Sequence, residues 1–210
     1  ESLREGYFKT LRITTAISIP AAVGIILVAP SFVQGFLGED WIPMVRVMQI
    51  LAIWGLIRSI GANVGPVFDA VGRPDYNTKT QLVKVILIVV SILPAANYWG
   101  IEGIAVVIVG SSLFGSTPLG IYIVLHLLDA QFSRYIEIIA YPLIASSLMG
   151  VSVMACTRIL EMLESEPIFT FSILSIWGSV SYVITIISFI KVFDYEIGED
   201  LKQMTKSIRS

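Results

Sequence analysis

The chain has 210 residues, of which 55% are hydrophobic and only 14% are charged, and its mean hydropathy is +0.81. A soluble domain carries about 25% charged residues, so this composition excludes a soluble protein and indicates an integral membrane protein. The net charge of −2 argues against a nucleic-acid partner, which would need a basic surface. The single cysteine, Cys156, excludes an internal disulfide and a cysteine-based metal site.

Six apolar stretches are long enough to span a membrane, since a spanning helix needs about 20 mostly apolar residues. None of them alternates in polarity as a β-barrel strand does. Short turns with glycine or proline separate the stretches, so neighbouring helices run antiparallel. We therefore predict an all-α membrane domain over residues 1–193, an up-and-down bundle followed by a polar tail at 194–210. The predicted spans are about 13–37, 44–71, 80–98, 101–128, 136–160 and 168–193.

The distribution of lysine and arginine predicts the orientation of the bundle. Most of the 14 basic residues fall on one side if the N-terminus is cytoplasmic, and the turns on the other side are acidic. We therefore expect both termini, including the tail, to lie on the cytoplasmic side of the cell membrane. Because the sequence starts at Glu1, without an initiator methionine or a signal-peptide pattern, we expect it to be part of a longer protein.

The second predicted helix carries an arginine, Arg58, near the middle of the membrane. A charge at that depth costs about 2.5–3.5 kcal/mol on insertion scales, and it usually faces a bundle interior or a polar pathway. Helical periodicity places charged and small residues on one face of this helix, namely Trp54, Arg58, Gly61, Ala62, Gly65 and Asp69. Arg58 could pair with a carboxylate elsewhere in the bundle or could meet an anionic ligand, and we favour the ligand.

Other polar residues have simpler explanations. Asp69 is spaced to pair with Arg73 one helical turn later, and Arg46 is close enough to a helix end to reach water. His126 with Asp129 could form a proton relay, but a residue beside a helix end explains this histidine better. The sequence has no catalytic or phosphate-cradling motif. We expect neither an enzyme nor a bound cofactor or metal.

Three motifs occur in a fixed order along the chain. They are FLGEDW at residues 36–41, FDAVGRP at 68–74 and YWGIEGIA at 98–105. In this order, the chain resembles the C-terminal half of polysaccharide or oligosaccharide flippases. These are Wzx-like transporters of the superfamily that also holds MATE multidrug antiporters and lipid II flippases. Each motif consists mostly of turn and packing residues, so the motifs indicate the family better than its cargo.

The resemblance implies one lobe of a two-lobed transporter with a central cavity. Its cargo would be a saccharide linked to a polyprenyl diphosphate, moved across the cytoplasmic membrane for surface glycan assembly. The implied partners are this lipid-linked saccharide, membrane lipids, the N-terminal lobe of the same protein and other glycan-assembly proteins. Arginine matches phosphate geometry, so we expect Arg58 and Arg46 to attract the diphosphate, and Trp54 and Asn63 to touch sugar or lipid. Asp69 completes the candidate cavity residues.

Two alternatives remain open at this point. A MATE-like, cation-coupled multidrug exporter would need a carboxylate deep in the membrane, and the only candidate, Asp69, is near a helix end. A membrane enzyme or scaffold of glycan assembly, such as a polymerase, would be expected to carry a long loop outside the membrane. The predicted loops are short.

Overall fold

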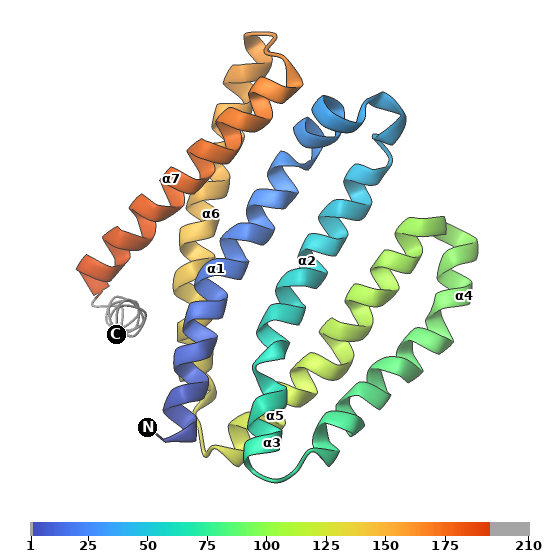
Figure 1. The fold of residues 1–210 in the computed structure, drawn as a ribbon, viewed down its shortest axis with the longest axis vertical. Helices are drawn as coiled ribbons and strands as arrows, with labels where there is room; N and C mark the ends of the chain where they lie inside the picture. The colour runs from blue at the N-terminus through green and yellow to red at the C-terminus, as the bar shows by residue number, and fades with distance from the viewer. Residues whose placement is uncertain (1, 194–210) are drawn as a thin grey trace, which may run out of the picture.

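The computed structural model describes residues 2–193, and these residues form helices and turns without a β-strand (Figure 1). The all-α fold class is therefore confirmed for this part of the chain, and the predicted tail at 194–210 lies outside the described residues. Long helices run alternately up and down, as expected for a bundle with short turns (Figure 1). The helical elements are α1 (Leu3–Phe32), η1 (Val33–Leu37), η2 (Glu39–Trp41), α2 (Met44–Ala62), α3 (Val64–Ala70), α4 (Asp75–Ser111), η3 (Ser112–Ser116), α5 (Thr117–Leu127), α6 (Phe132–Met162) and α7 (Pro167–Phe193).

The number of separate membrane helices was predicted wrongly. Five apolar helical stretches within residues 2–193 are long enough to cross a membrane, not six, because Asp75–Leu127 forms one stretch that is bent back on itself at Gly100. The predicted spans 80–98 and 101–128 are its two arms, and the chain reverses between them at Gly100 (φ 58°, ψ −138°) (Figure 1). Only glycine adopts a positive φ without strain, so one residue replaces the expected turn. We call residues 75–127 the hairpin.

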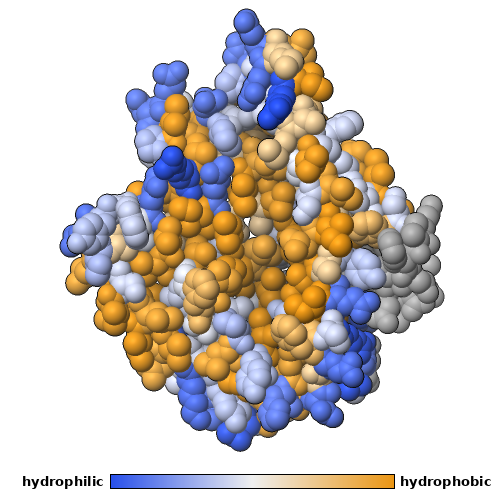
Figure 2. All heavy atoms as spheres, turned by 180° about the vertical axis from the view of Figure 1, so that it is seen from behind, coloured by the Kyte–Doolittle hydropathy of each residue, from blue (hydrophilic) through white to orange (hydrophobic). Residues whose placement is uncertain are grey.

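The outer surface is that of a multi-pass membrane protein. Figure 2 shows one face on which hydrophobic residues cover most of the middle, while hydrophilic residues gather toward the edges. Large aliphatic side chains are open to the surroundings on several helices, for example Leu93 of α4 and Ile176 of α7, which are 71% and 67% exposed. Exposed aliphatic residues in such numbers require an apolar solvent, which is the lipid bilayer.

A hydrophobic cluster joins four helices at the end of the bundle that holds the N-terminus, which we call the base. Phe8 of α1, Phe68 of α3 and Val124 of α5 are fully buried there, and Tyr135 and Ile138 of α6 complete the contact. Lipid tails are as apolar as these side chains, so close packing rather than the hydrophobic effect supplies the stabilisation. The cluster fixes α3 and the end of α5 relative to α1.

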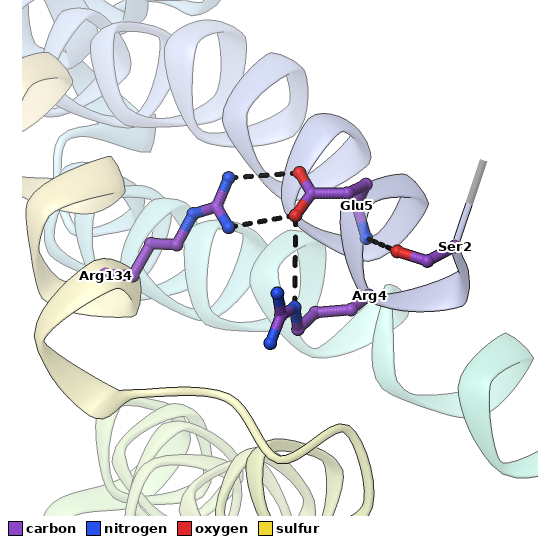
Figure 3. Close-up of polar contacts among 4 residues, drawn as sticks. All are labelled: Ser2, Arg4, Glu5 and Arg134. Atoms are coloured by element: carbon purple, nitrogen blue, oxygen red, sulfur yellow. Dashed lines mark hydrogen bonds and ion pairs between the residues drawn. The ribbon is translucent and has the colours of Figure 1, made fainter.

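Polar contacts between helices support the packing. Arg134 at the start of α6 donates two hydrogen bonds of 3.0 Å to the carboxylate of Glu5 at the start of α1 (Figure 3). The Tyr182 hydroxyl of α7 donates to the carbonyl of Ala16 at 2.7 Å, and the Gln49 amide of α2 donates to the carbonyl of Ile26 at 2.9 Å. Hydrogen bonds of this kind hold membrane helices in register.

Two helix interruptions lie at the same level of the bundle. The break between α2 and α3 falls at Asn63, three residues before Pro66. The π-helical turn η3 directly precedes Pro118, at the start of α5. Proline lacks the N–H that a regular helix needs and clashes with the preceding turn, which accounts for both interruptions. π-Helical turns are frequent at functional sites, and the candidate site lies between these two.

Candidate functional site

A polar cavity of about 260 Å³ lies between α2–α3 on one side and the hairpin on the other. Three groups of side chains line it. Arg58 of α2 and Lys84 of α4 are cationic, and Gly61, Ala62 and Gly65 form a wall of small residues. The remaining polar lining consists of Asn77, Thr80, Gln81, Ser112, Ser116 and Thr117. A polar cavity in a bundle of otherwise apolar helices marks a functional-site candidate.

The two cations give the cavity a positive charge. Arg58 and Lys84 come from different helices and are close enough to repel each other electrostatically. Within the described part of the chain, no aspartate or glutamate lines the cavity. Two like charges without a lining carboxylate attract an anion, and low-dielectric walls strengthen that attraction. The guanidinium of Arg58 also has the planar donor geometry that matches phosphate oxygens.

Trp54 lies one helical turn from Arg58 and contacts it without lining the cavity. The guanidinium carbon of Arg58 is 5.5 Å from the centre of the Trp54 ring. A cation–π contact of this kind contributes about 0.5–1 kcal/mol at an exposed site. The indole N–H is buried and has no hydrogen-bond partner within residues 2–193. Trp54 therefore orients the Arg58 side chain without itself lining the cavity.

Glycines make room for the cavity. A Cβ atom on Gly61 would lie 3.5 Å from the Thr117 hydroxyl oxygen, and one on Gly65 would lie 4.0 Å from the Asn77 amide nitrogen. Both are ordinary contact distances, so each glycine faces a polar side chain of the hairpin across a narrow space. A larger side chain at either position would occupy the cavity.

Asn63 and Arg46 lie outside this cavity. The Asn63 amide nitrogen is 3.4 Å from the carbonyl oxygens of Ser59 and Ile60, so it helps to end its own helix. Asn63 lines a separate pocket of about 320 Å³ between α1 and α3. Arg46, with a side chain 77% exposed, is 3.8 Å from the Glu102 carboxylate near the tip of the hairpin. The structure therefore brings neither residue to Arg58.

Asp69 is also remote, and the expected ion pair with Arg73 is not formed. Asp69 is exposed near the end of α3, and the Arg73 guanidinium instead donates to Asp75 at 3.1 Å. α3 ends at Ala70, and Gly72 then takes a positive φ of 71°. The regular helical spacing that would bring residues 69 and 73 together is therefore lost. His126 is exposed in the last turn of α5, and its carbonyl accepts from the Asp129 N–H at 3.3 Å, which agrees with a residue beside a helix end.

The sequence reading missed the hairpin side of the site. Asn77, Gln81 and Lys84 recur at intervals of four and three residues, which places them on one face of α4. This polar face is a usable signal, but a lysine near a predicted helix end is equally well explained by a side chain that reaches water. The serines and threonine of η3 and α5 carried no comparable pattern, because their position depends on the π-helical turn.

Comparisons with known proteins give a consistent relationship. A family model described as polysaccharide biosynthesis protein matches residues 1–46. The lipopolysaccharide biosynthesis protein WzxC of Escherichia coli K12 is 32% identical over 104 residues, which is 50% of this chain and 21% of WzxC. An uncharacterized membrane protein in the cps region of Klebsiella pneumoniae is 30% identical over 107 residues, covering 50% of this chain and 22% of that protein.

A third relative is the teichuronic acid biosynthesis protein TuaB of Bacillus subtilis 168, which is 32% identical over 73 residues, or 35% of this chain and 15% of TuaB. The matches to the first two relatives thus cover about a fifth of each protein, 21% and 22%. No solved structure matches the chain significantly. The resemblance drawn from the sequence motifs is confirmed as a similarity to Wzx-type polysaccharide biosynthesis proteins, over the half of the chain that these matches cover.

Proposed function

We propose that this chain is the C-terminal lobe of a flippase that moves a polyprenyl-diphosphate-linked oligosaccharide across the cytoplasmic membrane. One observation carries the proposal: Arg58 and Lys84 share a polar cavity inside a bundle of apolar helices. The N-terminal lobe of the same protein would supply the facing wall, and both termini of this chain would lie in the cytoplasm. No bond is made or broken in such a step, so the chain acts as a transporter and not as an enzyme.

The cost of placing two cations in a membrane supports an anionic cargo. A charge at the depth of the membrane centre costs about 2.5–3.5 kcal/mol by insertion measurements, and the described lining offers no carboxylate to offset it. A diphosphate carries negative charge that both cations can share, with hydrogen bonds that are stronger than those between neutral groups. The relatives named for lipopolysaccharide and teichuronic acid biosynthesis support a saccharide as the attached group.

A cation-coupled drug exporter receives no support from the cavity. That function needs a carboxylate in the membrane interior to bind a cation or a basic drug. Asp69 is exposed near the end of α3 and does not line the cavity of Arg58.

The proposal can be tested by surface glycan display in cells that lack their own flippase and express the full-length protein. We expect Arg58→Ala to abolish display, and Arg58→Lys to retain part of it because the charge remains without the bidentate geometry. Arg158→Ala is the matched control, since Arg158 is an exposed arginine of α6 outside the cavity. Normal display by Arg58→Ala at wild-type protein levels would refute the proposal.

A further inference from the structure

The cavity has two chemically different levels. Arg58 and Gly65 are seven residues apart along α2–α3, and Lys84 and Asn77 are seven residues apart along the first arm of the hairpin. The two segments run in opposite directions (Figure 1). Gly65 faces Asn77, with a built Cβ 4.0 Å from the amide nitrogen, and Arg58 and Lys84 interact electrostatically. Seven residues of helix span about 10 Å, so this distance separates the cationic level from the level of Asn77.

The level of Asn77 is neutral and rich in hydrogen-bonding groups. Asn77 and Gln81 are exposed side chains on the same face of α4, one turn apart. Within residues 2–193, neither side-chain amide forms a hydrogen bond to another protein group. The hydroxyl of the buried Thr80, in contrast, donates a hydrogen bond of 2.9 Å to the backbone carbonyl of Asn77. A side-chain amide has both donors and an acceptor. Two free amides in a cavity can therefore bind a ligand rich in hydroxyl groups.

The position of this level also indicates which end of a ligand it meets. Asn77 lies two residues after the start of α4 at the base of the bundle, and Lys84 lies two turns further into the apolar part of the hairpin. A ligand whose anionic group links a lipid chain to a neutral polar group places the anionic group nearer to the apolar region and the neutral group nearer to water. A lipid-linked saccharide has this order, with the diphosphate between the lipid chain and the sugar.

We propose that Asn77 and Gln81 form a saccharide subsite that binds the sugar next to the diphosphate, while Arg58 and Lys84 hold the diphosphate about 10 Å deeper in the bundle. The inference rests on the proposed function, because it assigns the two parts of that cargo to two levels of the same cavity. It adds an orientation, with the sugar toward the base, and two residues that determine whether a sugar-bearing lipid is preferred over the bare carrier.

The experiment compares two ligands on the purified full-length protein in detergent. One ligand is polyprenyl diphosphate, and the other is the polyprenyl-diphosphate-linked saccharide extracted from the cells that make it. We expect the double variant Asn77→Ala/Gln81→Ala to lower the affinity for the saccharide-bearing lipid by about tenfold, the effect of losing two modest hydrogen bonds. Binding of polyprenyl diphosphate is expected to stay within about twofold of wild type, because no hydrogen bond to it is lost. Lys84→Gln is expected to weaken both ligands.

The control variant is Thr78→Ala, which changes an exposed polar residue of α4 that does not line the cavity, and it should bind both lipids normally. An equal loss of affinity for the two lipids in the double variant, or no loss for either, would overturn the saccharide subsite while leaving the proposed function intact. If the wild-type protein binds neither lipid, the proposed function itself fails. The two failures are therefore distinguishable.

Discussion

Arg134 holds Glu5 with two parallel hydrogen bonds of 3.0 Å and lies over the ring of Phe8, with its guanidinium carbon 4.8 Å from the ring centre. The contact joins residues that are 129 positions apart in the sequence, at the base of α1 and α6 (Figure 3). Arg134 is 34% exposed and Glu5 is 41% exposed, so solvent weakens the ion pair. The bidentate geometry and the packing on Phe8 offset part of that weakening.

The first prediction concerns this contact. Arg134→Ala should destabilise the protein by about 1–2 kcal/mol, from the lost ion pair and the lost cation–π contact. Arg134→Lys should cost less, because the charge remains but the paired geometry does not. Thermal unfolding of the purified full-length protein measures the effect, with Arg158→Ala as the control. Equal melting temperatures for Arg134→Ala and the control would contradict the stabilising role.

The second prediction concerns the reversal at Gly100, whose φ of 58° is unfavourable for other residues. Gly100→Ala should destabilise the hairpin by about 1–3 kcal/mol, the cost of a sparsely populated backbone conformation for a residue with a Cβ. Gly110→Ala is the matched control, because Gly110 is helical and a Cβ there meets open space. It should be neutral or stabilising by up to about 1 kcal/mol. Denaturant unfolding that shows the same stability for both variants would argue against the strained reversal.

The third prediction tests the space beside Arg58. Gly65→Leu should block transport without loss of stability, because its side chain would enter the cavity toward Asn77 and no close contact forbids it. Gly55→Leu is the matched control on the preceding helix α2, since a Cβ at Gly55 meets open space and lies outside the cavity. Glycan display and melting temperature are measured for both variants. Equal transport by the two would show that the cavity is not used.

The fourth prediction concerns anion binding as such. Inorganic pyrophosphate should raise the melting temperature of the full-length protein, since a ligand that binds only the folded state stabilises it, by about 2.7 kcal/mol at a hundred times its dissociation constant. Lys84→Gln should reduce this shift by removing one of the two charges. Sodium chloride at matched ionic strength separates specific binding from screening. A shift of equal size in wild type and Lys84→Gln would contradict a shared site.

The sequence was sufficient to predict the α2 side of the cavity and insufficient for the hairpin side. Helical periodicity alone places Arg58, Gly61 and Gly65 on one face, because the rise and turn of a helix are fixed. Whether Lys84 lines the same cavity as Arg58 depends on which helices are neighbours and on their register. That information lies in tertiary packing, which a single helix does not encode.

The same distinction explains the remaining errors. Asp69 and Arg73 were expected to pair because they are four residues apart, but the intervening positive φ of Gly72 ends the helical spacing. The reversal at Gly100 needs only one residue, so the two spans predicted on either side of it form one helical stretch, and the described residues have five such stretches instead of six. In both cases a glycine in a left-handed conformation changed the path of the chain, and glycine is compatible with several paths.

In the proposed transport step, Arg58 and Lys84 together hold the diphosphate of a lipid-linked saccharide. The most direct measurement is the rate at which the full-length protein, reconstituted in vesicles, moves polyprenyl-diphosphate-linked saccharide from one leaflet to the other. We predict that wild-type protein and the Arg158→Gln control accelerate this movement, and that Arg58→Gln/Lys84→Gln reduces it to the rate of vesicles without protein. Movement at the wild-type rate by the double variant, or none by the wild type, would contradict the account.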